Sequence, residues 1–569
     1  MSRVHLLISR LAFAVILLLV AAVPLVFCHA FDNAFRETKF ITIWTLSAVL
    51  GLAFAASGTL RLPKMVLLAL GIHAALMTQS LIGAVHPGRG LSYLMEQLSM
   101  LVLLPAGASF VSSPRRRGLL LATLLLAADA VLLIGVAQLE GRDPVGTGLV
   151  SGLPVSTLGF KNLAAQVYLL AGVLAASQLI LTPRSYWPAA FLATTFFLML
   201  LGVWLMRSRS AFLGLVVGLA TVVIVARWRR GRASTMRRLL MPTATGLVIA
   251  GAVTLVSVRA QEGPRSFARP PPWQTVEATA TLNTRLIRWH NSLRMVLDHP
   301  VRGVGLGNFR VHYPRYGVDD PEQTGSRNVH EAHNEFLQVL AETGAVGLAG
   351  FLALLIVVAR ALHGAALRAE TEPEQRDLSL SCLGMLAGIL TQTVFSFALR
   401  NPTPPVWLWT CCGAALSAPA VSRMTRLRSG VRLVACVLLA ALFAAYASVS
   451  AKASQMTAAG AAALGQGRLE DARALFERAS LHPNADRALL NLCYVEGRLG
   501  RRAAAVSACR RALARQPNNH IIHDQLARQL QSAGLYQEAL FHYERALTTD
   551  PELTRARIER DKLLKLLSK

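Results

Sequence analysis

Residues 281–350 read TLNTRLIRWHNSLRMVLDHPVRGVGLGNFRVHYPRYGVDDPEQTGSRNVHEAHNEFLQVLAETGAVGLAG. This segment is polar, is rich in glycine and proline, and carries arginines, histidines and asparagines close together. The sequence before it consists mostly of runs of leucine, valine and alanine. A chain that devotes several hundred residues to apolar helices and then forms one long polar loop is expected to hold its chemistry in that loop.

The composition of the whole chain describes what surrounds this segment. Of its 569 residues, 53% are hydrophobic and only 16% are charged, and the mean hydropathy is +0.45. Apolar runs long enough to cross a hydrocarbon core of about 30 Å recur through the first 450 positions. We therefore predict an all-α fold, a polytopic membrane helix bundle of about 12 to 13 spans. The predicted spans lie near residues 6–28, 40–57, 63–84, 92–111, 118–138, 162–182, 188–206, 210–226, 239–258, 344–361, 379–398, 405–421 and 432–450.

The formal net charge of +27 first suggests a nucleic-acid partner. The arginines, however, lie mainly in short loops between apolar runs, where the positive-inside rule places them in the cytoplasm. With a cytoplasmic N-terminus, clusters such as RWRRGRASTMRR at 227–238 fall on that side, and everything after residue 450 falls on the other. Membrane lipids and an anionic lipid-linked substrate therefore replace nucleic acid as the expected partners. The predicted parts of the chain are transmembrane helices in 1–258, a large non-cytoplasmic loop in 259–343, transmembrane helices in 344–450, and a tail in 451–569.

The tail has a repeating pattern of its own. Pro483, Pro517 and Pro551 recur every 34 residues, and Gly500 and Gly534 share that spacing. A 34-residue period with small residues inside paired helices and proline at the turn resembles the tetratricopeptide repeat. Stacks of this kind form an α-solenoid with a concave face that binds a peptide or another protein. We therefore predict that the tail is a platform for a partner or an acceptor.

No metal or cofactor is predicted from the sequence. The seven cysteines form no CxxC or Cys/His pattern with zinc spacing, and Cys493 and Cys509 stand in the helical tail without a motif. The segment HEAH, from His330 to His333, is not HExxH, in which two histidines lie four positions apart. Glycines at 303, 305 and 307 do not form GxGxxG after a buried strand, which excludes a dinucleotide-binding turn.

Several motifs follow one another through the polar loop. Asn283-Thr284-Arg285 precedes Trp289, a glycine-rich turn spans residues 303–307, and His333-Asn334 precedes a helix that begins with Gly344. As an ordered set, these motifs resemble the O-antigen ligase and polymerase superfamily, and the resemblance covers roughly residues 1–450. It implies a GT-C-like, metal-independent membrane glycosyltransferase. Such an enzyme moves a glycan from undecaprenyl diphosphate to an acceptor hydroxyl at the periplasmic face of the bacterial inner membrane.

The resemblance assigns the central role to His333, which matches the family's catalytic histidine. An unperturbed histidine pKa of about 6.5 suits a group that deprotonates or orients an acceptor hydroxyl near neutral pH. An alternative is that His333 caps the following helix. His330 lies three positions earlier and is expected to share a helix face with His333. We predict that His330 and Asn334 contact the substrate.

Arginines match the family in two places. Arg285 lies four residues before Trp289, as in the family pattern, and Arg288 lies beside that tryptophan. Arg209, within Ser208-Arg209-Ser210, matches the family's Ser-Arg-Gly/Ala signature, with serine where a smaller residue is usual. Guanidinium groups stay charged and grip phosphate oxygens in pairs, so they suit a departing diphosphate. The alternative for Arg285 and Arg288 is a loop position facing solvent or lipid headgroups.

Lys161 and Asn162 open an apolar span on the same predicted side. Gly159-Phe160-Lys161-Asn162 is similar to the family's Gly-x-x-Asn segment. A helix N-terminus with an adjacent lysine forms a seat for phosphate, so we expect both residues to contact the donor. The alternative is an interfacial lysine that reaches toward headgroups.

The shared motif leaves the acceptor open. The leading prediction is the lipid A–core oligosaccharide, as in an O-antigen ligase. Another carrier-linked glycan would make the chain a polymerase, and a protein hydroxyl would make it an O-oligosaccharyltransferase. A transporter would show internal symmetry around discontinuous helices, which this sequence lacks. A scaffold that only displays the tail would leave the arginines and histidine unexplained.

Overall fold

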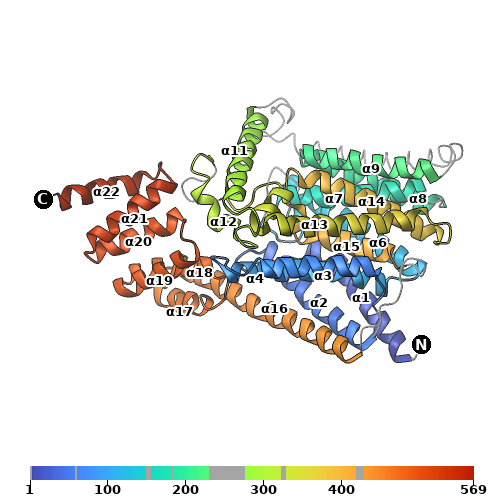
Figure 1. The fold of residues 1–569 in the computed structure, drawn as a ribbon, viewed down its shortest axis with the longest axis horizontal. Coiled ribbons are helices and arrows are strands. Elements are labelled where there is room, and N and C mark those ends of the chain that lie inside the picture. The colour runs from blue at the N-terminus through green and yellow to red at the C-terminus, as the bar shows by residue number, and fades with distance from the viewer. Residues whose placement is uncertain are drawn as a thin grey trace.

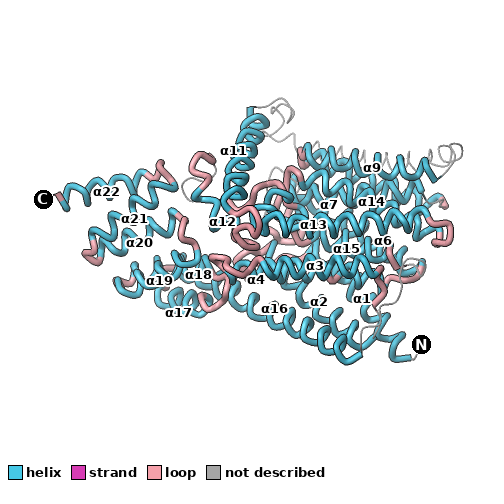
Figure 2. The backbone as a smooth tube through the Cα atoms, in the orientation of Figure 1, coloured by secondary structure: helices cyan, strands magenta, loops and turns pink. Residues whose placement is uncertain are grey.

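The computed structural model describes residues 3–57, 60–148, 155–181, 185–229, 276–321, 329–417 and 429–568. These residues form helices and connecting loops, with no strand among them, which confirms the predicted all-α fold. Figure 1 shows a bundle of long helices at one end and a curved row of shorter helices, the tail, at the other. Many of the loops drawn in Figure 2 gather where the bundle meets the tail.

Nine described stretches are long and apolar enough to cross a membrane. The chain is therefore a multi-pass membrane protein. These stretches correspond to helices α1 (Arg3–Leu25), α2 (Arg36–Ser57), α4 (Pro87–Leu101) together with α5 (Leu103–Phe110), α6 (Pro114–Leu139), α7 (Lys161–Leu181), α8 (Tyr186–Leu205), α9 (Arg209–Arg229), α13 (Glu335–Leu367) and α16 (Ser429–Gly465).

Three further predicted spans are helices that fall outside these nine. They are α3 (Lys64–Gln79), α14 (Pro373–Thr393) and α15 (Thr403–Ala415). Every residue of α15 is buried, and α14 is buried along most of its length. A helix enclosed by other helices needs neither the length nor the apolar surface of one that faces lipid. The predicted span at 239–258 lies outside the described residues.

Small residues set the packing between α9 and α14. A side chain at Gly214 would collide with the backbone of Gly388, and one at Gly218 would collide with the backbone of Gly384. Close helix approach at small residues is a common way to join helices in membranes, because backbones then make van der Waals contact. The two pairs run in opposite directions along the chain, so α9 and α14 are antiparallel.

Helix α13 is broken at Gly344, whose φ is 67° and ψ is −173°. The loop between Pro300 and Gly305 fits into the break. The Val304 and Gly305 N–H groups donate to the carbonyl oxygens of Ala341 and Glu342, at 2.9 and 2.8 Å, and the Ala345 N–H donates to Pro300 at 2.9 Å. The glycine-rich turn therefore satisfies backbone groups that the break leaves open.

The large segment predicted as a loop contains a long helix, α11 (Val276–Asp298). The short α12 (Phe309–His312) and the 3₁₀ turn η2 (Tyr313–Arg315) follow it. Buried Met295, Phe309 and Tyr313 form a small core under α11. The segment folds because it has apolar contacts of its own, and α11 stands upright above the start of α13 (Figure 1).

The tail begins as a direct continuation of α16, which runs for 37 residues without interruption. Gly467, Gly500 and Gly534 have φ between 74° and 80° at successive turns, a conformation that favours glycine. Consecutive tail helices pack side by side. Their assignment to the tetratricopeptide repeat remains a prediction. The helices are α17 (Leu469–Ala479), α18 (Asp486–Arg498), α19 (Arg502–Arg515), α20 (His520–Ser532), α21 (Tyr536–Thr549) and α22 (Thr554–Leu567).

The tail is docked onto the loops at the end of the bundle. Asp486 accepts a hydrogen bond of 2.7 Å from His86, at the start of α4, and lies 3.5 Å from Arg89. Asn518 donates to the carbonyl oxygen of Val311 at 3.2 Å. His86 is in turn held by Asn308, which accepts from its N–H at 2.8 Å. The tail therefore contacts the same turns that fill the break in α13.

Candidate functional site

His333 lies immediately before α13, in a backbone conformation that non-glycine residues rarely adopt. Its φ is 54°, and such residues cluster at functional sites because the surroundings must stabilise them. The ring lies edge-on to Phe397, with 5.3 Å between centroids. Its Nδ1 is buried without a hydrogen-bond partner among the described residues. The helix cap is the next residue, Asn334, whose Oδ1 accepts from the Leu337 N–H at 3.1 Å.

Helix α11 brings its arginines to this histidine. Trp289 Nε1 donates to the carbonyl oxygen of Ala332 at 3.1 Å, which ties α11 to the residue before His333. Arg288 is buried and pairs with buried Asp320, through distances of 2.9 and 3.3 Å. Arg285, one turn earlier on α11, is half-buried. Arg288 thus serves the loop's internal structure, and Arg285 is the better placed of the two for an incoming anion.

These neighbours determine the protonation state of His333. Burial lowers its pKa, and the guanidinium groups of Arg288 and Arg285 act in the same direction. Together they bring the pKa to about 3. The imidazole is therefore neutral at pH 7, as a group that accepts a proton must be. An anion bound to the arginines would offset their charge and raise the pKa of His333.

Arg209 approaches the same region from another helix. It is the first residue of α9 and is exposed, and Ser208 caps the helix by accepting from the Ala211 N–H at 3.4 Å. The antiparallel register of α9 and α14 places Arg209 level with Thr393, the last residue of α14. Two residues further on, Phe395 lies against Trp289, with ring centroids 6.1 Å apart. Arg209 and the α11 arginines therefore lie at the same end of the bundle.

Lys161 and Asn162 begin α7 and are half-buried. One turn further along that helix, Gln166 accepts a hydrogen bond of 2.8 Å from Asn401. The start of α7 is thus near the loop that carries Phe397, which contacts His333. Contact between Lys161 or Asn162 and a phosphate remains a prediction.

Sequence reasoning missed Arg400, which holds together the first residues of α13, directly after His333 in the chain. Arg400 is buried, and its Nε and Nη1 donate to Glu335 and Glu342, each at 2.8 Å. Gln338 links this network to the histidine: it donates to Glu342 at 3.0 Å and accepts from the Ala332 N–H at 2.5 Å. An arginine in a short loop on the predicted non-cytoplasmic side is the signal that marks it, since charges there are disfavoured.

His330 occupies a different environment from His333. The prediction that the two share a helix face is wrong, because α13 begins only at Glu335 and residues 329–334 are not helical. His330 is exposed, and its charged neighbours are Arg310, Arg89 and Arg36 rather than the α11 arginines. The Asn334 side chain caps α13. For both residues, a contact with substrate stays a prediction.

Among the described residues, no group of three or more histidine, cysteine, aspartate or glutamate side chains is placed to hold a metal ion. The candidate site thus consists of a neutral histidine, the two α11 arginines that act on it, and the start of a broken helix. It lies at one end of a multi-pass helix bundle. The chain is thus a multi-pass helical membrane protein, and binding of an anionic ligand at this end of the bundle stays a prediction.

The comparison with known families makes this class specific. Residues 194–352 match the family model described as O-antigen ligase, and this match supports the resemblance to the O-antigen ligase superfamily. The matched segment includes Arg209, Arg285, Arg288 and His333. The family points to membrane glycosyl transfer of the ligase or polymerase type, with a lipid-linked glycan donor and a glycan acceptor. No curated protein matches the chain.

Proposed function

We propose that this chain transfers a glycan from undecaprenyl diphosphate to an acceptor hydroxyl at the periplasmic face of the inner membrane. The acceptor in this proposal is the lipid A–core oligosaccharide. The observation that carries the proposal is the approach of α11 to the start of α13, which puts Arg285 beside a neutral, buried His333. The family match over 194–352 supports the same chemistry.

The chemical step uses these groups in separate roles. As the acceptor oxygen bonds to the anomeric carbon, its proton passes to the His333 imidazole. The bond between that carbon and the diphosphate oxygen breaks, and its electron pair leaves on the diphosphate. Arg285 and Arg209 offset the charge that grows there, and charge-assisted contacts to phosphate are among the stronger hydrogen bonds. Lys161, at the start of α7, adds positive charge on the donor side.

Two observations support the periplasmic orientation. The dense arginine clusters of the sequence alternate between loops, as the positive-inside rule requires when the site end of the bundle is outside the cytoplasm. In the tail, Cys493 and Cys509 form a disulfide between α18 and α19, with Cα atoms 5.1 Å apart. Disulfides persist mainly in oxidising compartments such as the bacterial periplasm.

A second candidate acceptor is a protein hydroxyl. The docked tail favours it, because contacts such as the one from Asp486 to His86 fix a helical platform close to the site. A protein held on that platform would present its side chains within reach of the same histidine. Comparing glycans from a deletion strain separates the two acceptors: loss of long-chain lipopolysaccharide supports the first, and loss of a glycoprotein supports the second.

The test of the catalytic assignment is His333→Ala. We expect glycan transfer by the purified full-length protein to fall by at least about a hundredfold, the lower end of what a general base contributes. Membrane insertion and yield should match those of the original chain. Arg294→Ala, at an exposed position further along α11, is the control and should keep transfer intact. Full activity of His333→Ala contradicts the assignment.

A further inference from the structure

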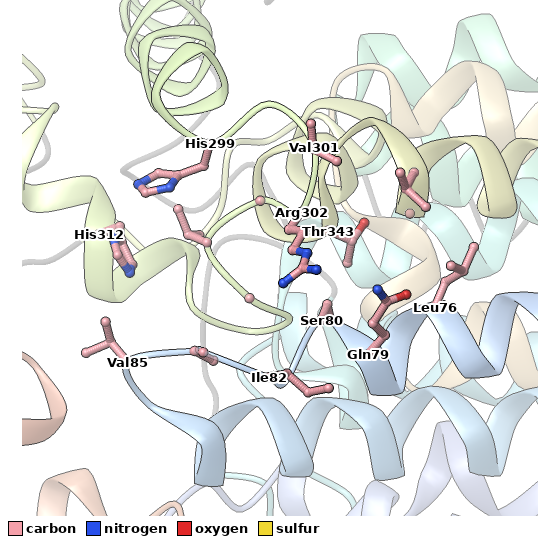
Figure 3. A pocket seen from close by; sticks show the side chains of 17 residues that line it. Leu76, Gln79, Ser80, Ile82, Val85, His299, Val301, Arg302, His312 and Thr343 are labelled. Carbon is pink, nitrogen blue, oxygen red and sulfur yellow. The ribbon is translucent and has the colours of Figure 1, made fainter.

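A cavity of about 300 Å³ lies next to the candidate site, and none of the residues given a catalytic role above lines it. It is enclosed by the end of α3, the loop at 80–85, the turn at 299–305 and the break in α13. Figure 3 shows these segments surrounding a hollow, with Gln79 and Ser80 on one wall and His299 and His312 on another. Its volume lies within the usual range for small-ligand sites, roughly 300–1,000 Å³.

The polar groups of this cavity are suited to an anion. The Arg302 guanidinium points toward Ser80 and Gln79 (Figure 3) and makes no ion pair with any described residue. His299 and His312 lie with ring centroids 5.8 Å apart. The buried Nε2 of His312 has no hydrogen-bond partner among the described residues. No carboxylate side chain is among the residues that line the cavity. An exposed guanidinium, with two imidazole groups on another wall of the same cavity, can bind phosphate or carboxylate oxygens.

The rim of the cavity is apolar and exposed on the surface of the protein. Ile82, Val301 and Val346 are 74%, 59% and 46% exposed, although each is a large apolar residue. Below them, α3 and α13 pack together and expose further apolar side chains such as Ile72 and Ile356. A cationic hollow at the top of a lipid-facing seam fits a ligand with an anionic head and a hydrocarbon anchor.

The cavity also leads toward the reacting groups. A second, smaller hollow of about 30 Å³ shares Leu76, Thr343 and Gly347 with it and reaches Glu335 and Arg400. Glu335 follows Asn334 directly and is therefore two positions from His333. The two hollows therefore lie side by side, and the second one brings the neighbourhood of the cavity to within two residues of His333 in the chain.

The cavity is separate from the residues proposed above to contact the donor diphosphate. Helix α14 packs against α13 and in turn against α9, which begins with Arg209, whereas α3 lies along the opposite side of α13 in the view of Figure 1. A transfer between two lipid-linked molecules needs two headgroups to reach His333 without occupying the same space. A headgroup in the cavity beside α3 would leave the α14 side of α13 free for the donor.

We propose that the cavity between α3 and α13 binds the anionic headgroup of the lipid-anchored acceptor, a phosphate- or carboxylate-bearing sugar, with Arg302 as its anchor. This inference rests on the proposed glycan transfer and specifies where the acceptor binds. It makes Arg302, His299 and His312 determinants of acceptor affinity rather than catalytic residues.

The kinetic test uses Arg302→Gln in the full-length protein, reconstituted in neutral phosphatidylcholine nanodiscs. We expect the KM for a lipid A–core acceptor to rise about tenfold, while kcat and the KM for the undecaprenyl diphosphate donor stay unchanged. Arg294→Gln removes the same charge from an exposed position outside the cavity and should change none of these values. An unchanged acceptor KM, or a rise in the donor KM instead, overturns the proposal.

A binding measurement keeps the cavity separate from the proposed reaction. Fluorescent lipid A–core is titrated into the nanodiscs without donor, and Arg302→Gln should weaken its binding about tenfold. Val346→Trp, which fills the rim without changing charge, should weaken it as well. Equal competition by phosphatidylglycerol would identify a bulk-lipid site and overturn the proposal. Weakened binding without any transfer by the original chain would refute the transfer function and leave the cavity assignment standing.

Discussion

At the scale of single residues, the site depends on how charge is distributed around one imidazole. Arg288 is fully committed to Asp320, whereas Arg285 is half-buried on the same helix face. The two guanidinium groups still act on His333, because both hold its pKa down after burial has lowered it. His333 is therefore neutral at pH 7, and an anion bound by the arginines would raise its pKa.

The pH dependence of transfer should show this coupling. We expect kcat/KM, which reports the free enzyme, to stay level from pH 8 down to about pH 5, because the pKa of His333 is about 3. The acid limb of kcat should lie at higher pH, since bound diphosphate raises that pKa. Arg285→Gln should move the acid limb of kcat/KM upward, toward the ordinary histidine pKa of about 6.5.

Initial rates over pH 4–9 at low and saturating donor measure both profiles. A limb of kcat/KM near pH 6.5 in the original chain would contradict the neutral, arginine-depressed histidine. Identical limbs for kcat/KM and kcat would contradict the coupling to bound diphosphate.

At the scale of the elements, the break in α13 is the feature on which the site depends. The glycine-rich turn fills the break with backbone hydrogen bonds, and a side chain at Gly344 would meet the carbonyl of Val301. The short helical piece that begins at Glu335 carries Arg400's two carboxylate partners. The break thus fixes the direction of that piece, and with it the position of His333.

Substitution of Gly344 by alanine should be strongly destabilising. Its φ of 67° with ψ near 180° is a region available essentially to glycine, and strain there costs about 1–3 kcal/mol before any collision. We expect a lower thermal midpoint in detergent and a large loss of transfer. Gly364→Ala, in the regular part of the same helix with no close neighbour, is the matched control and should be neutral or slightly stabilising. Equal midpoints for the two variants would show that the break tolerates a side chain.

Particular residues show how much of this the sequence predicted. Hydropathy and charge alternation predicted the all-α membrane bundle, because lipid imposes a long apolar pattern on each span. They also predicted spans at 379–398 and 405–421, where the structure has the buried helices α14 and α15. Periodicity cannot distinguish a helix enclosed by protein from one enclosed by lipid.

The ordered motifs of the loop named His333 and Arg285 as candidate site residues, and their roles remain predictions. The structure adds that Trp289 ties α11 to the residue before His333. Arg400 and the pairing of Cys493 with Cys509 were missed, because each depends on a partner brought close only by the fold. The sequence analysis also placed His330 and His333 on one helix. Asn334 is the cap of α13, so both histidines precede the helix.

At the scale of the whole molecule, the tail and the bundle are joined through a short series of polar contacts. Asp486 of the tail receives hydrogen bonds from His86 at 2.7 Å and from Gln516 at 2.6 Å. Asn308 accepts a hydrogen bond from the His86 N–H and donates one to the carbonyl oxygen of Leu306. Leu306 belongs to the glycine-rich turn that fills the break in α13. A contact made by the tail therefore bears on the turn that positions the catalytic segment.

Loss of the carboxylate at this junction should loosen both parts. Asp486→Asn keeps the shape of the side chain and leaves His86 and Arg89 without their anion, at a cost on the order of 3 kcal/mol for a mostly buried pair. We expect faster hydrogen exchange at residues 303–312 and faster proteolysis between the tail and the bundle. Asp471→Asn, on the tail at an exposed ion pair, is the control and should leave exchange unchanged. Unaltered exchange in Asp486→Asn would show that the tail and the turn are independent.

The unbroken length of α16 determines how far the tail lies from the rest of the bundle. Its 37 residues extend about 55 Å at 1.5 Å per residue, and a hydrocarbon core takes up about 30 Å of that length. Because the helix has no joint and the tail is also docked at Asp486, the row of tail helices is held at a fixed distance from the helix bundle. A molecule bound to the tail would therefore be held at one distance from the candidate site. Reach, rather than sequence alone, would then decide which of its hydroxyl groups meet the carrier-linked sugar.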